Sequence, residues 1–334
     1  MTIMPAPPKS YAHGRFGTAE QIAVLTAVEP SVAAAMGEHL AKRKLWFPND
    51  LMPADSEMSE AQDEELRALR LRARGIPDAA RVAVALNLLT EEGLPHFHRL
   101  IAVYMSNESV WRAWNNVWTA EEDRHGCAMR DYVRDARIFN MGALERMQYR
   151  YIESGFNPDW QQDPYRLLAY TSLQEKATQV AHANTGRTCG KHEPRIQRIL
   201  AHIAGDESKH YAFYRAAFGA ILERDTNNAL FSLLKVMPAL AMPGHSMPGY
   251  DHMSDVVRRA DIYGPRHYEK IVEELLEHWG IGNLLGLSGE GREWQEKLMK
   301  IPARLARMAD YLEAKAVGLR NFCFDFIYDR TITI

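Results

Sequence analysis

Cysteine is scarce in this chain of 334 residues: Cys127, Cys189 and Cys323 are the only three, and they lie far apart. Their number and spacing exclude a disulfide framework and a Cys/His zinc site, and they favour a reducing compartment. No apolar stretch approaches the roughly 18 residues of a transmembrane helix, and the amino terminus lacks the apolar core of a secretory signal. We therefore expect a soluble, cytoplasmic protein without an integral membrane segment.

Neither sign of charge dominates the composition. Lys and Arg together number 40 and Asp and Glu 43, which leaves a formal net charge of −3. This balance argues against non-specific binding to nucleic acid, which needs a concentrated basic surface. Glycine and proline, at 21 and 16, are too few for a linker-dominated or fibrous protein. The 46% of hydrophobic residues is typical of a globular chain with a large core.

Helical patterns cover most of the chain. Amphipathic periodicity with short interruptions predicts helices at 78–104, 108–136, 141–154, 164–185, 195–223, 226–236, 265–279 and 289–318, after an earlier helix that ends near Gly75. The stretch 237–250 is the longest expected loop, and only 324–334 has a β-like alternation. Because no change in composition marks a boundary, we predict one all-α domain over residues 1–334, in which 1–45 forms an N-terminal extension and helix.

Two Glu-x-x-His motifs, Glu122 to His125 and Glu207 to His210, are the first candidates for chemistry. Residues three apart on an α-helix share a face, so each motif directs a carboxylate and an imidazole to one point. Apolar residues at steps of three and four continue the same face on both sides of each motif, which predicts that both pairs point into the core. Buried carboxylates without a partner are very unfavourable, so something positive must lie beside them.

Two further helices carry a single glutamate on an apolar face, Glu91 and Glu175. Glu91 precedes Glu122 by 31 residues, and Glu175 precedes Glu207 by 32. The single glutamates are 84 residues apart and the motifs 85, which indicates one helix-hairpin unit used twice. Taken singly, each of these residues is more often a solvated helix residue or a hydrogen-bonded core histidine, but the joint pattern reverses that expectation.

Four helices that supply two Glu and two Glu-x-x-His are typical of ferritin-like bundles that bind two metal ions. Four carboxylates balance two divalent cations, and oxygen and imidazole ligands without thiolate favour iron or manganese over structural zinc. We therefore predict an all-α, ferritin-like di-iron four-helix bundle with additional helices. Glu92, Glu121 and Asp123 are predicted to lie on other faces and are excluded as ligands. His98 shares the face of Glu91, and we expect it to form a hydrogen bond in the interior.

Seven strings of residues make the chain resemble the soluble acyl-acyl carrier protein (acyl-ACP) desaturases of the stearoyl-ACP Δ9 type. They are Trp46–Asp50, Thr90–Pro95, Trp118–Gly126, Tyr170–Thr178, Asp206–His210, Gly286–Gly291 and Phe326–Arg330. The similarity extends from about Trp46 to the carboxyl terminus. It implies O2-dependent insertion of a cis double bond into a saturated fatty acyl chain carried on ACP, by a helical homodimer with a short C-terminal β-hairpin.

The resemblance also assigns roles to single residues. It implies that two iron ions (Fe2+) are bound by Glu91, Glu122, His125, Glu175, Glu207 and His210, with Glu122 and Glu207 as the bridging carboxylates. Thr178 matches a threonine beside the metal pair with a proposed role in oxygen activation or proton delivery. Trp46 and Asp206 match positions proposed to carry electrons from a ferredoxin-type donor towards His125. Asp206 equally fits an ordinary hydrogen-bonding partner of that imidazole.

Six residues match the substrate tunnel of the plant enzymes: Phe97, Leu100, Val103, Tyr104, Pro158 and Leu167. Tyr104 and Leu167 are bulkier than their plant counterparts, and the connection between Glu91 and Glu122 is several residues shorter. We therefore hypothesise a narrower or shorter tunnel, which would change the preferred acyl chain or the position of the double bond.

Two other functions remain open at this point. A di-iron oxygenase on the same scaffold would hydroxylate or N-oxidise a different substrate. A ferritin-like iron-storage or metal-binding protein would have the same ligands. Storage, however, needs a short chain that assembles into a hollow shell, so the length of 334 residues and the Trp-rich apolar interior argue against it.

Overall fold

The computed structural model is mostly helical and describes residues 18–52, 60–105, 109–156, 158, 160, 162–238 and 243–334. The helices are α1 (Thr18–Lys42), α2 (Pro48–Leu51), α3 (Glu60–Ala73), α4 (Asp78–Glu91), α5 (Leu94–Tyr104), α6 (Val110–Ala136), α7 (Met141–Ser154), α8 (Pro164–Gly190), α9 (Pro194–Arg224), α10 (Thr226–Val236), α11 (Tyr250–Arg259), α12 (Pro265–His278), α13 (Gly289–Met299) and α14 (Ile301–Lys315). Short 3-10 turns lie at Pro243–Ser246 (η1), Ile281–Asn283 (η2) and Asp325–Ile327 (η3). The predicted all-α class is confirmed.

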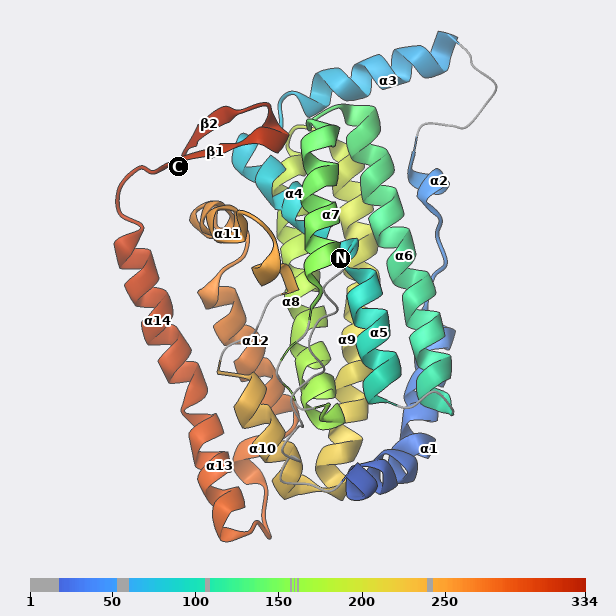
Figure 1. Cartoon of the computed structure of the whole chain (residues 1–334), viewed down its shortest axis with the longest axis vertical. Helices are drawn as coiled ribbons and strands as arrows, with labels where there is room; N and C mark the ends of the chain where they lie inside the picture. Colours follow the sequence, from blue (N-terminus) through green and yellow to red (C-terminus); the bar gives the residue numbers. More distant parts are fainter. Residues whose placement is uncertain are drawn as a thin grey trace, which may run out of the picture.

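Four helices, α4, α6, α8 and α9, form the central bundle and run along the long axis of the molecule (Figure 1). α5 continues the line of α4 and packs against α6 and α8, while α1 lies across α9 and α6. On the other side α12 packs against α8, and α14 packs against α12. The outer helices therefore enclose the bundle, so the side chains that face its axis are buried.

Two of the bundle helices, α8 and α9, begin at a proline that follows an acidic cap. Asp163 accepts hydrogen bonds from the first backbone N–H groups of α8, and Glu193 accepts one from Ile196 at the start of α9. Pro164 and Pro194 occupy the first helical positions, where a missing N–H costs nothing. These caps and prolines fix where α8 and α9 start. They therefore also fix how far along the bundle axis Glu175 and Glu207 lie.

A polar layer divides the apolar core into two clusters. On α6, Trp118 belongs to the cluster on one side of the layer and Ala128 to the cluster on the other. Glu122 and His125 lie between them in the chain. The Glu-x-x-His motif of α9 also lies between these two clusters. Along α9 the chain passes through the clusters in the reverse order, because α9 runs in the opposite direction to α6. The candidate ligands therefore sit at mid-height of the bundle with apolar packing above and below.

One predicted helix, 78–104, is broken in the structure. α4 ends at Glu91, and α5 begins at Leu94 after a turn at Glu92 and Gly93. Pro95 has no N–H to donate to the carbonyl of Glu91, so the α-helical hydrogen bonding fails at this point. The predicted helix 289–318 likewise divides into α13 and α14, and α11, directly after the expected loop, was not predicted.

The C-terminal β-hairpin is confirmed. β1 (Asn321–Phe324) pairs antiparallel with β2 (Arg330–Thr333), with Phe322 opposite Ile332 and both side chains buried. Within the part of the chain that the structure describes, no helix combines the length and the apolar character that crossing a bilayer requires.

The break between α4 and α5 gives a prediction for stability. A Cβ at Gly93 would lie 2.6 Å from the Tyr151 hydroxyl and 2.9 Å from the Thr90 carbonyl oxygen. We expect Gly93→Ala to lower the free energy of unfolding by about 1–3 kcal/mol, because the backbone must move to relieve the overlap. Chemical denaturation monitored by circular dichroism measures the change.

The control is Gly37→Ala on the exposed face of α1, where a Cβ meets nothing within 4 Å. This substitution should raise the free energy of unfolding by roughly 0.5–1 kcal/mol, because alanine favours a helix interior over glycine. Equal effects of the two substitutions would contradict the close packing at the break.

Candidate metal centre

The six predicted ligands converge in the centre of the bundle. Their oxygen and nitrogen atoms form two overlapping groups in which all ligand atoms lie within 4.8 Å of one another. One group contains Glu91, Glu122, His125 and Glu207, and the other contains Glu122, Glu175, Glu207 and His210. Glu122 and Glu207 belong to both groups. Two cations bound side by side would therefore share these two carboxylates.

The atoms that face this centre lack hydrogen-bonding partners. Within the described chain, no well-formed hydrogen bond reaches Glu122 Oε1, His125 Nδ1, Glu175 Oε2, Glu207 Oε1 or His210 Nδ1, although all are buried. They point at one another instead: His125 Nδ1 lies 3.2 Å from Glu207 Oε1, and His210 Nδ1 lies 2.9 Å from Glu122 Oε1. Buried polar atoms are normally paired, so this donor set fits a pair of metal ions.

Electrostatics divide the four inner carboxylates into two kinds. Burial, reinforced by the Glu207 carboxylate, raises the pKa of Glu175 well above its ordinary value and raises the pKa of Glu122 as well. Burial alone would also raise the pKa values of Glu91 and Glu207, and of Glu121 and Asp206 outside them, but neighbouring imidazoles hold all four below the ordinary range. Glu122 and Glu175 thus require a further cation to be ionised, whereas the other four are already paired anions.

Each candidate imidazole ligand has its outer nitrogen directed at one of these anions. His125 Nε2 lies 3.5 Å from Asp206 Oδ2, and His210 Nε2 donates to Glu121 Oε2 at 2.9 Å. Such pairing fixes the orientation of a metal-bound histidine. The expectation that Glu121 points away from the site was wrong, because Glu121 is buried beside His210. The sequence signal was an acidic residue directly before each Glu-x-x-His.

The single glutamates have donors of their own. His182 Nε2 donates to Glu91 Oε1 at 2.6 Å, and Trp118 Nε1 donates to Glu175 Oε1 at 3.2 Å. His182 follows Glu175 by seven residues, as His98 follows Glu91. His98 Nδ1 instead lies 2.8 Å from the Thr119 hydroxyl oxygen. His98 belongs to neither of the two groups of candidate ligands. The break before α5 shifts His98 away, so the two halves of the repeat differ here.

Thr178 and Trp46 contact opposite sides of the centre. The Thr178 hydroxyl donates to Glu207 Oε2 at 2.8 Å. The Trp46 indole donates to Asp206 Oδ2 at 2.7 Å, and its ring lies parallel to the His125 imidazole with the centroids 6.0 Å apart. The structure thus brings both residues to the centre, together with Asp206.

A surface cleft and a small cavity lie beside the candidate ligands. The cleft, about 930 Å³, lies between α4, α8, α11, α12 and α14, and His182 is among its lining residues. The cavity, about 30 Å³, is lined by Glu91, Glu122 and Glu207 together with Leu94 and Phe97. Thr90 and Thr178 line both spaces. The cleft therefore borders the cavity at these two threonines.

The six tunnel candidates are not all on the buried side. Phe97, Leu100 and Leu167 are buried in the same apolar cluster, and Tyr104 and Pro158 are half-buried. Val103 lies on the outer face of α5 with its side chain 56% exposed. Of the six, Phe97 alone is among the residues that line the cavity, and Val103 lies outside the apolar core.

Aromatic rings fill the space behind Phe97. Phe97 contacts Phe156 and Tyr170, with ring centroids 5.4 and 6.4 Å apart. Tyr170 contacts Trp160 at 4.6 Å, and Trp160 contacts Tyr104 at 6.4 Å. The route from the cavity towards Tyr104 is thus occupied by side chains. Sequence analysis missed Phe156 and Trp160.

Comparisons with known proteins agree with this geometry. A family model described as fatty acid desaturase matches residues 20–328. The chain is 30% identical over 306 residues to a chloroplastic stearoyl-[acyl-carrier-protein] 9-desaturase of Ricinus communis, which covers 87% of this chain and 77% of the relative. It is 34% identical over 308 residues to a chloroplastic stearoyl-[acyl-carrier-protein] 9-desaturase 1 of Oryza sativa subsp. japonica, covering 86% and 80%.

A solved structure shares the fold. The X-ray structure of DesA2 from Mycobacterium tuberculosis H37Rv matches 81% of this chain and 99% of its own, with a TM-score of 0.59 at 20% sequence identity.

The hydrogen bond from His182 to Glu91 gives a prediction for metal binding. His182→Ala removes the donor that fixes Glu91, and we expect affinity for ferrous iron to fall by about 10–100-fold, as is typical when such a partner is lost. Anaerobic equilibrium dialysis against Fe2+ measures the change. The control is His98→Ala at the equivalent position of the repeat, which should leave iron affinity within about twofold. A reversed order of effects would contradict the role of His182.

Proposed function

Because this chain belongs to the acyl-ACP desaturase family, a di-iron family of oxidoreductases, we propose that it inserts a cis double bond into a saturated fatty acyl chain carried on ACP. The observation that carries the proposal is the pair of overlapping Glu/His groups. They lie beside a small cavity, and two of its lining residues, Thr90 and Thr178, also line a surface cleft. Glu91, Glu122, His125, Glu175, Glu207 and His210 are the proposed ligands of two iron ions. Glu122 and Glu207 are the proposed bridges.

The reaction requires more than side chains can supply. Hydrogen removal from an unactivated methylene needs an oxidant, which two ferrous ions and O2 provide when bound. The overall balance is one O2, two substrate hydrogens, two electrons and two protons, giving the double bond and two waters. The protein positions the acyl chain and keeps bulk water away from the reacting carbons. The hydroxyl of Thr178, between the cleft and Glu207, is the proposed proton-carrying group.

Electrons must come from outside the chain. The contact of Trp46 with Asp206 and its parallel stacking on His125 support a route through these groups. A ferredoxin-type protein is the proposed donor, and a homodimer is the proposed assembly. The sparse cysteines support the cytoplasm as the proposed compartment.

The acyl chain is proposed to enter through the cleft and to end near Phe97. The rings of Phe97, Phe156, Tyr170 and Trp160 leave little room beyond the metal pair. Few carbons would then fit beyond the oxidised bond, which supports the shorter tunnel hypothesised from the sequence.

The ligand assignment has a direct test. Glu122→Ala, or equally Glu207→Ala, removes one bridging carboxylate, so we expect loss of stoichiometric iron and of all product. The assay is anaerobic loading with Fe2+, then addition of reductant, O2 and acyl-ACP, with fatty-acid analysis. Asp123→Ala, one residue along α6 on its exposed face, should keep both iron and product. Retention of two irons in the Glu122→Ala variant would refute the assignment.

The tunnel proposal predicts the position of the double bond. Wild-type protein given acyl-ACPs of graded length should place the bond at a constant, short distance from the methyl end. Trp160→Ala and Phe97→Ala remove rings from that end, so the bond should move away from the methyl end by one or more carbons. Val103→Ala, on the exposed side of α5, should leave it unchanged. An unchanged stearoyl Δ9 product in all proteins would refute the shorter tunnel.

A further inference from the structure

The segment 39–46 contacts both carboxylates that lie outside the imidazole ligands. At the end of α1, His39 Nε2 donates to Glu121 Oε2 at 2.9 Å, and Arg43 Nη1 donates to Glu121 Oε1 at 3.1 Å. Three residues later, the Trp46 indole donates to Asp206 Oδ2 at 2.7 Å. One short stretch of chain outside the four-helix bundle thus reaches the outer sides of both His210 and His125.

These contacts compensate two buried negative charges. Glu121 and Asp206 are each 3% exposed, and a buried carboxylate is stable only when it is well paired. Without the segment, Glu121 would keep one of its three donors, the imidazole of His210. Asp206 would keep Arg124, Lys209 and His125. The segment therefore matters more for the Glu121 side than for the Asp206 side.

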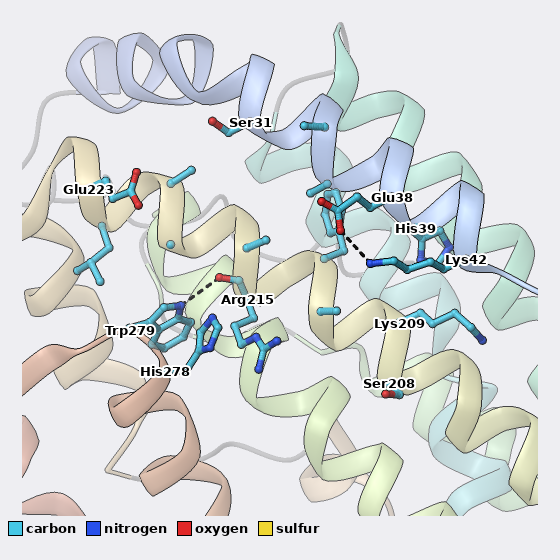
Figure 2. A pocket seen from close by; sticks show the side chains of 18 of the residues that line it. Ser31, Glu38, His39, Lys42, Ser208, Lys209, Arg215, Glu223, His278 and Trp279 are labelled. Atoms are coloured by element: carbon cyan, nitrogen blue, oxygen red, sulfur yellow. Dashed lines mark hydrogen bonds and ion pairs between the residues drawn. The ribbon is translucent and has the colours of Figure 1, made fainter.

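The segment is held differently from the rest of α1. Nearer the start of α1, Leu25, Val28 and Val32 are buried in the apolar core, so packing fixes that part of the helix. Towards its end α1 borders a cleft of about 900 Å³ against α9, with His39 on the wall (Figure 2). Among the described residues, Lys42 forms an ion pair with the exposed Glu38 of the same helix and with no other residue. Polar contacts with Glu121 and Asp206 therefore attach the segment together with the packing of two rings, Trp46 in the apolar core and His39 against Trp114.

We propose that the segment 39–46 is a positioning element for the metal pair, and that its docking and metal binding strengthen each other. A metal ion on Nδ1 of His210 or His125 requires the other ring nitrogen to donate to an ionised carboxylate. The segment stabilises both of those carboxylates. By thermodynamic reciprocity, the factor by which the segment raises metal affinity equals the factor by which metal strengthens docking of the segment.

The first measurement is anaerobic titration of the full-length protein with Fe2+ alone. The double variant His39→Ala/Arg43→Ala should lose about 10–100-fold in affinity for one of the two ions, the one bound by His210 and Glu175. Trp46→Phe should weaken the other ion, and by less. The matched control is Lys42→Ala, next to Arg43 and three residues after His39, with affinities unchanged. His39→Gln keeps an N–H donor and should recover much of the loss, which separates positioning from misfolding.

The second measurement is hydrogen exchange of backbone amides in wild-type protein with and without Fe2+. Metal should slow exchange in peptides that contain residues 36–46 by a factor similar to the affinity lost in the double variant. Peptides from α14, far from the centre, should not change. In the double variant the metal-dependent protection of residues 36–46 should disappear.

The inference rests on the metal pair of the proposed function, and the two fail differently. Wild-type protein that binds no iron would overturn the proposed function itself. Wild-type protein that binds two irons, together with a double variant of equal affinity or with metal-independent exchange at residues 36–46, would overturn only the role of the segment.

Discussion

The structure depends on the cost of burying four carboxylates inside a bundle of helices. Glu91, Glu122, Glu175 and Glu207 are buried at mid-height between two apolar clusters. In the described part of the chain, their ion-pair partners are histidines and include no lysine or arginine. Such a layer is tolerable only if cations or protons occupy its centre. The hydrogen-bonding partners outside this polar layer each keep one of the proposed ligands ionised, or oriented, or both. Binding of the proposed metal pair would therefore also stabilise the native bundle.

The internal repeat places the ligands symmetrically, but the use of the site is asymmetric. α8 continues unbroken past Glu175, and His182 on its next turns reaches across to Glu91. α4 stops at Glu91 because of Pro95, so the equivalent His98 moves away and Trp118 takes its place on Glu175. The same break brings Leu94 and Phe97 to the wall of the cavity. One proline thus gives the two halves of a symmetric set of carboxylates and imidazoles different surroundings.

Periodicity and repetition were enough to predict the helical class and the side chains that meet in the bundle, whereas the C-terminal hairpin was implied by the family resemblance. They failed where a single residue overrides the pattern, as at Pro95, where the heptad-like spacing continues but the hydrogen bonding does not. They also failed for Glu121, because a face drawn for one straight helix ignores α1 packed against it. Phe156 and Trp160 carry no motif, so only the fold reveals that their rings close the cavity.

The cleft and the cavity share lining residues, so a molecule bound in the cleft can keep water away from the buried carboxylates. Thr90 and Thr178 line both spaces. The hydroxyl of each also donates a hydrogen bond to backbone carbonyl oxygens of its own helix. The Thr178 hydroxyl is additionally bound to Glu207. An alkyl chain lying in the cleft would cover this narrow point and exclude water from the ligand atoms, which strengthens every charge interaction among them. Substrate binding would therefore complete the low-dielectric enclosure that the bundle leaves open on this side.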